Sequence, residues 1–250
     1  MKIITLGTSH GDPTYCRHCS STLLQLSDDT GYLIDAGAPA NALMIRKGLR
    51  LTMLRAVFIT HQHEDHMGGL PGVLKTLVKY PKHDGATTEI LLPEQSGIDA
   101  TLAFMAATGR GWPPELLTFR VLPSAACCYA DDLVRVSTLP TEHMGASPSY
   151  GFLVETEGKR VVFSGDLHAS FRDFPLRPGD DPCDLCICEC VHYRLEDALP
   201  KLKQLPIKRM IFNHIGNAWH GEDNERRFRE LVAELPFPAT MAFDGDEFTV

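Results

Sequence analysis

One stretch of this 250-residue chain, His61-Gln62-His63-Glu64-Asp65-His66, decides the fold and the chemistry that we expect. It follows a continuous apolar run at residues 56–60 and precedes apolar residues at helical spacing from Leu70 to Val78. We therefore expect a strand, a loop and a helix, with the side chains of the loop converging. Imidazole and carboxylate ligands together suit divalent zinc, manganese or iron. Four such ligands within six residues are more than one ion takes comfortably from so short a loop, so they indicate two neighbouring ions.

Short apolar runs separated by turn residues extend in both directions from this loop. Before it, they predict a helix at residues 39–49 and strands at residues 2–6, 22–26, 32–34 and 56–60. After it, they predict strands at residues 90–92, 119–122, 133–139, 150–156, 160–164, 184–191 and 208–213. An amphipathic helix is expected at residues 222–235 and a strand at the C-terminus. Residues 95–126 are the hardest to interpret, and we expect a helix and a loop there.

The composition is that of an ordinary globular protein, with 44% apolar and 22% charged residues. A formal net charge of −8 disfavours a long nucleic-acid footprint, because proteins that bind phosphate backbones present basic surfaces. No apolar run approaches the roughly 20 residues that span a bilayer, and the first residues predict a strand and not a secretory signal. Together with eight cysteines expected to be reduced, these features predict a cytoplasmic protein with one domain, residues 1–250.

The motif His61-x-His63-x-Asp65-His66, followed by Gly68-Gly69-Leu70-Pro71, resembles the signature of the metallo-β-lactamase superfamily. The resemblance implies an α/β fold of four layers, an αββα sandwich of two packed mixed β-sheets with helices outside. It also implies further ligands that follow predicted strands, and the residues in matching order are His143, Asp166 and His214. The triplet Asp35-Ala36-Gly37 resembles the motif that supports the histidine loop from below.

The resemblance assigns a role to each of these residues. It implies two divalent ions, zinc first with manganese or iron as alternatives, and a hydroxide held between them as the nucleophile. The first ion would take three histidines, the second would take two histidines and Asp65, and Asp166 would bridge them. Asp65 would also hold the proton of the hydroxide with its second oxygen. The leaving oxygen needs an acid, for which His192 and His220 are the candidates.

Features outside the metal motif resemble ribonuclease Z and related phosphodiesterases. The matching residues are Leu6-Gly7-Thr8, Pro13-Thr14, Arg17, Ser20-Ser21, Asp184-Leu185 and Glu189. Cys188 stands where that group has a histidine before the glutamate. Ribonuclease Z carries a tRNA-gripping arm between the ligands matched by His143 and Asp166, but here this interval accommodates only a hairpin. We therefore expect a phosphodiesterase of small or cyclic phosphate diesters without the arm, and tRNA processing is disfavoured.

Two other functions stay open from the sequence. The same metal site serves a lactone or thioester hydrolase equally well, because a fold does not determine its substrate. A metal-binding or redox module without hydrolysis is the remote alternative, since the redox members typically replace one histidine ligand and add a flavin domain. The expected partner is a small-molecule substrate, with no membrane. The oligomeric state is open and includes a homodimer.

Two groups of cysteines invite a metal interpretation. Three of the four residues Cys183, Cys186, Cys188 and Cys190 lie inside a predicted apolar strand, where cysteine acts as a small hydrophobic residue. We expect this group to pack in the core. Cys16 and Cys19 flank His18 near the presumed site, and an extra zinc there would need another ligand, such as His220. We favour a plain surface loop for that segment.

Overall fold

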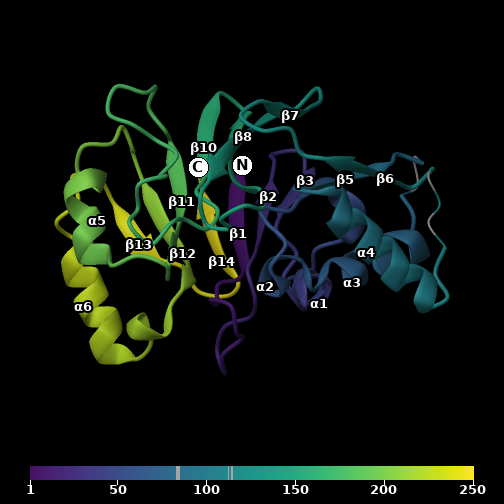
Figure 1. Ribbon diagram of the computed structural model, residues 1–250, viewed down its shortest axis with the longest axis horizontal. Coiled ribbons are helices and arrows are strands. Elements are labelled where there is room, and N and C mark those ends of the chain that lie inside the picture. Colours follow the sequence, from purple (N-terminus) through teal and green to yellow (C-terminus); the bar gives the residue numbers. More distant parts are fainter. Residues whose placement is uncertain (83–84, 112, 114) are drawn as a thin grey trace. The chain divides into compact units, whose positions relative to one another are not determined.

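The computed structural model describes residues 1–82, 85–111, 113 and 115–250. Within these residues the chain forms two compact units. The first comprises Met1–Leu122 and Asp244–Thr249, and the second comprises Pro123–Phe243 and Val250. Each unit contains a seven-stranded mixed β-sheet with its own helices, as Figure 1 shows by colour along the chain. The expectation of one domain over residues 1–250 stays a prediction.

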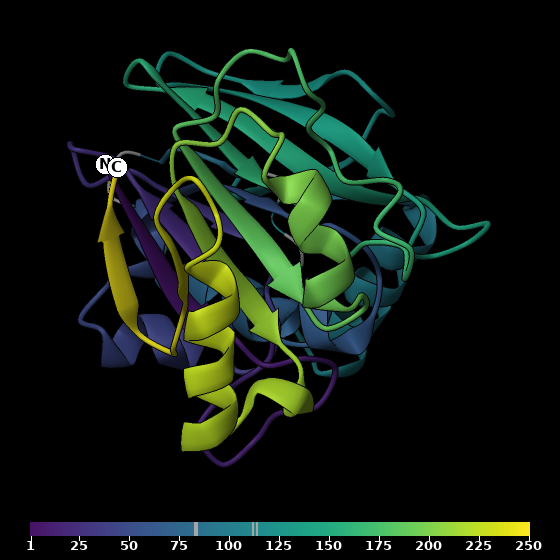
Figure 2. The same cartoon turned by 90° about the vertical axis from the view of Figure 1, so that its left-hand side faces the viewer.

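The sheet of the first unit has the strand order β14-β1-β2-β3-β4-β5-β6. Strands β3 to β6 run parallel, and β14, β1, β2 and β3 pair antiparallel. The two ends of the chain meet in this sheet, because Lys2 lies opposite Thr249 (Figure 2). Its strands are β1 (Lys2–Gly7), β2 (Ser21–Gln25), β3 (Gly31–Ile34), β4 (Leu54–Phe58), β5 (Thr88–Leu92), β6 (Leu117–Val121) and β14 (Asp246–Thr249).

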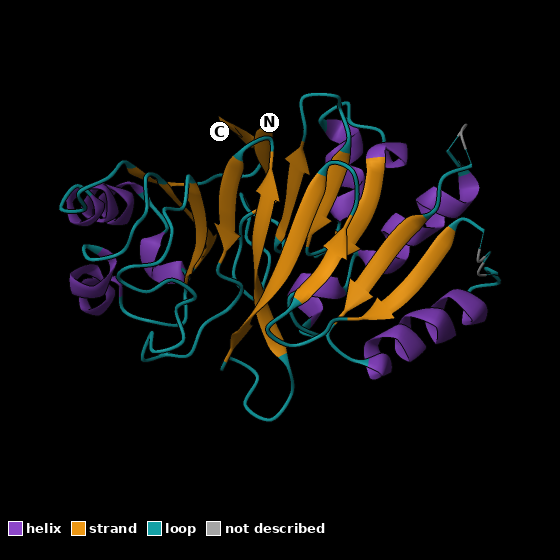
Figure 3. Cartoon of the chain, turned by 90° about the horizontal axis from the view of Figure 1, so that it is seen from above, coloured by secondary structure: helices purple, strands orange, loops and turns teal. Residues whose placement is uncertain are grey.

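Helices connect the parallel strands of the first unit, because a parallel pair needs a crossover connection. They are α1 (Ala40–Arg46), η1 (Leu51–Met53), α2 (Glu64–Met67), α3 (Leu70–Lys79) and α4 (Gln95–Ala107). Figure 3 shows the helices lying along the strands. Helix α3 buries Val73, Leu74 and Leu77 in the core of this unit, as the apolar spacing predicts. The segment at residues 95–126 contains α4 and also β6, which agrees with the strand expected at residues 119–122.

The sheet of the second unit has the order β13-β12-β11-β10-β9-β8-β7. Strands β10 to β13 run parallel, and β7 to β10 pair antiparallel. Its strands are β7 (Cys127–Ala130), β8 (Val134–Thr141), β9 (Ser149–Thr156), β10 (Lys159–Phe163), β11 (Leu185–Cys190), β12 (Met210–Ile215) and β13 (Ala239–Met241). Helices α5 (Leu195–Leu202) and α6 (Glu222–Val232) pack on this sheet through a common apolar core, and η2 (Asn217–Trp219) precedes α6.

Several elements of the second unit were not predicted, among them β7, α5 and η2. Strand β7 is only four residues long and contains two cysteines, so it carries little strand signal. Helix α5 buries Leu195, Leu199 and Leu202 at helical spacing, but Pro200 lies inside it and argues against a helix. Among the described residues, no helix is long and apolar enough to cross a membrane.

Two glycines near β10 differ in how tightly the chain surrounds them. Gly158 lies in the β9–β10 hairpin with a φ of 69°, and a Cβ there would meet nothing within 4 Å. Gly165 precedes Asp166 with a φ of 59°, and a Cβ there would lie 2.3 Å from the carbonyl oxygen of Tyr150. Both residues adopt the left-handed backbone conformation, but only at Gly165 would a Cβ also clash with a neighbour.

We expect Gly165→Ala to lower the free energy of unfolding by more than Gly158→Ala does. Left-handed backbone alone costs a non-glycine residue about 1–2 kcal/mol, which sets the loss for Gly158→Ala. The close approach to Tyr150 should add a similar amount at Gly165, as steric strain in a packed turn does. Urea unfolding of both variants measures the difference. Equal losses would show that the Tyr150 carbonyl moves aside at no cost.

Candidate metal centre

The histidine loop of the first unit begins where two parallel strands end. Ile34 of β3 lies opposite Phe58 of β4, so the residues after both strands emerge at the same edge of the sheet. Asp35 follows β3 directly, and its backbone N–H donates to the carbonyl of Phe58 over 2.8 Å. The N–H of Ala36 donates to the carbonyl of His66 over 2.7 Å, which ties the far end of the loop to the same place.

Asp35 organises the loop through its buried carboxylate. It accepts hydrogen bonds from the Thr60 backbone N–H (2.8 Å), the Thr60 hydroxyl (2.9 and 3.0 Å) and His66 Nδ1 (2.7 Å). A proton on Nδ1 of His66 leaves the lone pair on Nε2, the arrangement that a metal-binding histidine requires. This geometry agrees with the supporting role that the resemblance implies for Asp35. Thr60 was not singled out from the sequence, although it directly precedes His61.

The four predicted ligands of this loop lie together. Nε2 of His61 lies 3.0 Å from Nδ1 of His63, and Nε2 of His66 lies 3.2 Å from a carboxylate oxygen of Asp65. The rings of His61 and His66 have their centroids 4.1 Å apart. His61, Asp65 and His66 are buried, whereas His63 is exposed. Three imidazoles and one carboxylate in this arrangement fit the ligand chemistry of zinc and similar divalent ions.

The second unit brings its own predicted site residues to one edge of its sheet. Strands β10, β11 and β12 are parallel, and β8 runs the same way because β9 is antiparallel to both β8 and β10. His143 follows β8, Asp166 follows β10, His192 follows β11 and His214 belongs to the end of β12. Residues far apart in the sequence therefore meet where these strands end.

Asp166 lies at the centre of this second cluster. One oxygen of its buried carboxylate is 3.3 Å from His214 Nε2, 3.7 Å from His143 Nε2 and 3.7 Å from His192 Nδ1. His143, Asp166 and His192 offer ligand atoms that all lie within 4.8 Å of one another. A carboxylate among three imidazoles fits a divalent cation. The geometry is therefore compatible with two roles for His192, that of a proton donor and that of a metal ligand.

Glu189 holds His192 in place. Its buried carboxylate accepts hydrogen bonds from three backbone N–H groups, those of Leu167 (2.7 Å), Val191 (3.0 Å) and His192 (3.0 Å). Both of its oxygens also lie 3.0 Å from His192 Nδ1. A proton on Nδ1 is thereby directed toward Glu189, which places the lone pair of the neutral ring on Nε2.

Cys188, the departure from the ribonuclease Z pattern, packs behind this pair. Its Sγ lies 3.2 Å from the hydroxyl of Tyr193, and that hydroxyl donates to the backbone carbonyl of Glu189 over 2.6 Å. Burial raises the pKa of the Cys188 thiol to about 12, so the thiol stays protonated at neutral pH. Cys188 and Tyr193 therefore support the strand end that carries Glu189.

His220, the other candidate acid, is engaged elsewhere. Its Nε2 lies 3.3 Å from the backbone carbonyl oxygen of Ile215, which can only accept a hydrogen bond. That contact directs Nε2 of His220 to the backbone.

The four cysteines of the second unit's strand region pack as expected from the sequence. Cys183, Cys186, Cys188 and Cys190 are all buried in the apolar core of the second unit, and burial raises the pKa of Cys183 to about 11. Cys16 is exposed and Cys19 is buried, and His18 between them directs Nδ1 to Asp244 over 2.8 Å. Throughout the part of the chain that the structure describes, no group of metal-ligating side chains includes a cysteine.

The family of the chain follows from a comparison with family models. The model of the metallo-beta-lactamase superfamily matches residues 14–214. This chain belongs to the metallo-β-lactamase superfamily. It is 33% identical to the ribonuclease Z of Synechococcus sp. (strain WH7803) over 184 residues, which cover 72% of this chain and 54% of that protein. It spans about half the length of the first curated relatives that it matches.

An alignment with the ribonuclease Z of Macrococcus caseolyticus covers both chains completely at 23% identity. Among solved structures, the metallo-beta-lactamase fold protein YhfI from Bacillus subtilis matches with a TM-score of 0.76 and 19% identity over 99% of each chain. The short form of human tRNase Z matches with a TM-score of 0.75 and 20% identity over 100% of this chain and 99% of that chain. These likenesses confirm the predicted metallo-β-lactamase fold.

Proposed function

We propose that this superfamily member is a metal-dependent hydrolase that cleaves small or cyclic phosphate diesters. The observation that carries the proposal is the geometry of the histidine loop. Asp35 accepts a hydrogen bond from Nδ1 of His66, and Nε2 of His61 lies 3.0 Å from Nδ1 of His63. The cluster around Asp166 supports it independently from the second unit. Such ligand sets suit hydrolytic metal sites better than structural ones when oxygen and nitrogen ligands mix.

The proposed ligands divide between two divalent ions. His61, His63 and His143 would hold the first ion, Asp65, His66 and His214 would hold the second, and Asp166 would serve both. This division rests on the order of the motifs along the chain and on the geometry within each unit. Zinc is the first choice because imidazole and carboxylate are its usual oxygen and nitrogen ligands, with manganese or iron as alternatives.

The chemistry of the proposed reaction is shared between the ions and the side chains. Divalent ions held there would supply Lewis acidity and would lower the pKa of water from about 16 to about 7. Asp65 accepts the hydrogen of the attacking water with one carboxylate oxygen. His192, oriented by Glu189, donates a proton from Nε2 to the leaving oxygen. A phosphate diester suits this site because its leaving group departs as an alkoxide that needs the proton.

The short stretch of sequence between His143 and Asp166 favours a small substrate. Strands β9 and β10 with their short hairpin occupy most of this interval, so it holds no inserted arm. The net charge of −8 also disfavours a long phosphate backbone. The lactone or thioester hydrolase is the alternative on the same residues. The cytoplasmic location and the homodimer stay predictions.

The purified protein should carry close to two divalent ions per chain. Asp166→Ala should lower that number, because Asp166 is the only residue proposed as a ligand of both ions. Elemental analysis after reconstitution and dialysis measures the metal content. His168→Ala is the matched control, because His168 lies two residues away with Nδ1 bonded to Ser170, and it should keep both ions. One ion or fewer in the unchanged protein would contradict a dinuclear centre.

The substrate class should emerge from a panel of hydrolysis assays. We expect turnover of bis(p-nitrophenyl) phosphate and of cyclic nucleotides, slow turnover of lactones and thioesters, and no efficient 3′-end cleavage of precursor tRNA at physiological salt. The metal-free protein is the control for each assay. Efficient cleavage of precursor tRNA would overturn the argument from the missing arm, and preference for lactones would shift the function to the alternative.

His192→Ala should lower turnover on the order of 10²–10⁴-fold for substrates with alkoxide leaving groups, the usual span for lost general acid catalysis. The loss should be much smaller for p-nitrophenolate, which departs without a proton. Steady-state kinetics on both substrates, with metal analysis, provide the measurement. His220→Ala is the control and should change neither rate. A loss of metal in His192→Ala would make His192 a ligand, and equal losses on both substrates would indicate a misplaced substrate.

A further inference from the structure

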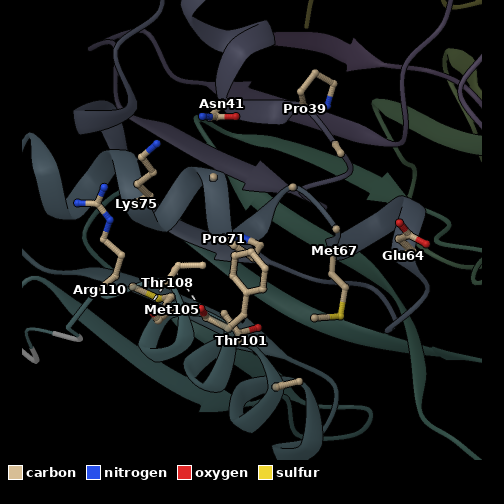
Figure 4. Close-up of a pocket in the computed structure, with 16 residues that line it drawn as sticks. Pro39, Asn41, Glu64, Met67, Pro71, Lys75, Thr101, Met105, Thr108 and Arg110 are labelled. Atoms are coloured by element: carbon tan, nitrogen blue, oxygen red, sulfur yellow. Dashed lines mark hydrogen bonds between the residues drawn. The ribbon is translucent and has the colours of Figure 1, made fainter.

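A groove of about 680 Å³ lies in the first unit, where helices α2, α3 and α4 and the segment before α1 come together (Figure 4). Its size is within the range of sites that bind small molecules, about 300–1,000 Å³. The described residues that line it include none of the predicted metal ligands. The groove is therefore a separate feature that the proposed reaction does not use.

The walls of the groove are apolar. Met67, Pro71, Phe104 and Met105 line it, and Figure 4 shows Met67, Pro71 and Met105 along its length. The side chain of Phe104 is 55% exposed, although a ring of this size favours burial. A thioether beside an aromatic ring adapts to ligands of different shapes. These walls therefore suit the hydrophobic body of a small molecule, aromatic or aliphatic.

One end of the groove is cationic. Lys75 of α3 and Arg110, which follows α4, lie at the same end, as Figure 4 shows. Among the described residues, neither side chain forms a hydrogen bond or an ion pair. The carboxylate that lines the groove, Glu64, lies at the opposite end. Two cations at one end of an apolar groove, with its carboxylate at the other end, together complement an anion.

We propose that this groove binds a small amphiphilic anion. Its apolar body lies against Phe104, Met67 and Met105, and its phosphate or carboxylate group accepts hydrogen bonds from Lys75 and Arg110. Arginine pairs with either anion through two parallel hydrogen bonds, and lysine adds a point charge. The proposal does not need the metal centre, although Met67 shares helix α2 with Asp65 and His66, which places the ligand against the helix of two predicted metal ligands.

Calorimetric titration of the Asp166→Ala protein, used free of metal, tests the proposal without interference from the metal centre. The probes are phenyl phosphate and hexanoate, with inorganic phosphate and phenol as the halves of the first probe. We expect both amphiphilic probes to bind and to weaken as salt is raised. Either half alone should bind at least ten-fold more weakly, because each lacks one of the two contacts. Equal affinity for phenyl phosphate and inorganic phosphate would overturn the apolar part of the site.

Variants of exposed residues separate the two parts of the groove without endangering the fold. The double variant Lys75→Gln with Arg110→Gln should weaken both probes at least ten-fold, since it removes both charge-assisted hydrogen bonds to the anion. Phe104→Ser should weaken phenyl phosphate several-fold. Lys79→Gln, on the same helix outside the groove, is the control and should bind normally. Unchanged binding in the double variant would overturn the proposal.

Sedimentation of the same proteins tests a rival occupant, a second copy of the chain. A dimer that dissociates in Phe104→Ser would assign the groove to that copy and overturn the small-molecule site. A sedimentation coefficient that is the same in Phe104→Ser and in its parent supports the proposal. Binding that persists in Asp166→Ala while that variant lacks metal would keep this site valid even if the proposed hydrolase activity fails.

Discussion

The buried carboxylate of Asp35 is the contact on which the histidine loop depends. It accepts hydrogen bonds from both donors of Thr60 and from His66, so one side chain fixes the beginning and the end of the loop. Each hydrogen bond to a buried charge contributes about 1.5–3 kcal/mol, and leaving such a charge without its donors costs more than the bonds contribute. These hydrogen bonds restrain the positions of the residues between Thr60 and His66. Within this loop, Nε2 of His61 lies 3.0 Å from Nδ1 of His63.

The backbone at both clusters adopts conformations that ordinary residues avoid. Asp35 has a φ of 60° and His214 a φ of 50°, each at the end of a parallel strand. A non-glycine residue in the left-handed region costs about 1–3 kcal/mol and persists only where its surroundings hold it. At Asp35 the three hydrogen-bond donors provide that support. Strain of this kind concentrates at functional sites, which agrees with the ligand role proposed for His214 and the supporting role of Asp35.

The second unit shows how a departure in sequence can be accommodated without losing the local geometry. Cys188 replaces the histidine of the ribonuclease Z pattern, yet Glu189 beside it still binds three backbone N–H groups and His192. The Tyr193 hydroxyl bridges Cys188 and the carbonyl of Glu189. The carboxylate that orients the histidine is therefore held by backbone contacts and by buried neighbours. A different residue at position 188 then changes the packing behind the site more than the site itself.

The sequence by itself determined the family, and it pointed to the proposed ligands of the histidine loop, because a motif such as His61-x-His63-x-Asp65-His66 places its side chains within one loop, where spacing alone brings them together. It also determined most strands and helices, since apolar periodicity is a local property. Only the tertiary structure showed that Thr60 shares Asp35 with His66, that Glu189 holds His192, and that His220 bonds to Ile215 instead. These contacts join residues from different strands or on opposite sides of a turn. Their formation depends on strand register and backbone direction, which local sequence patterns do not encode.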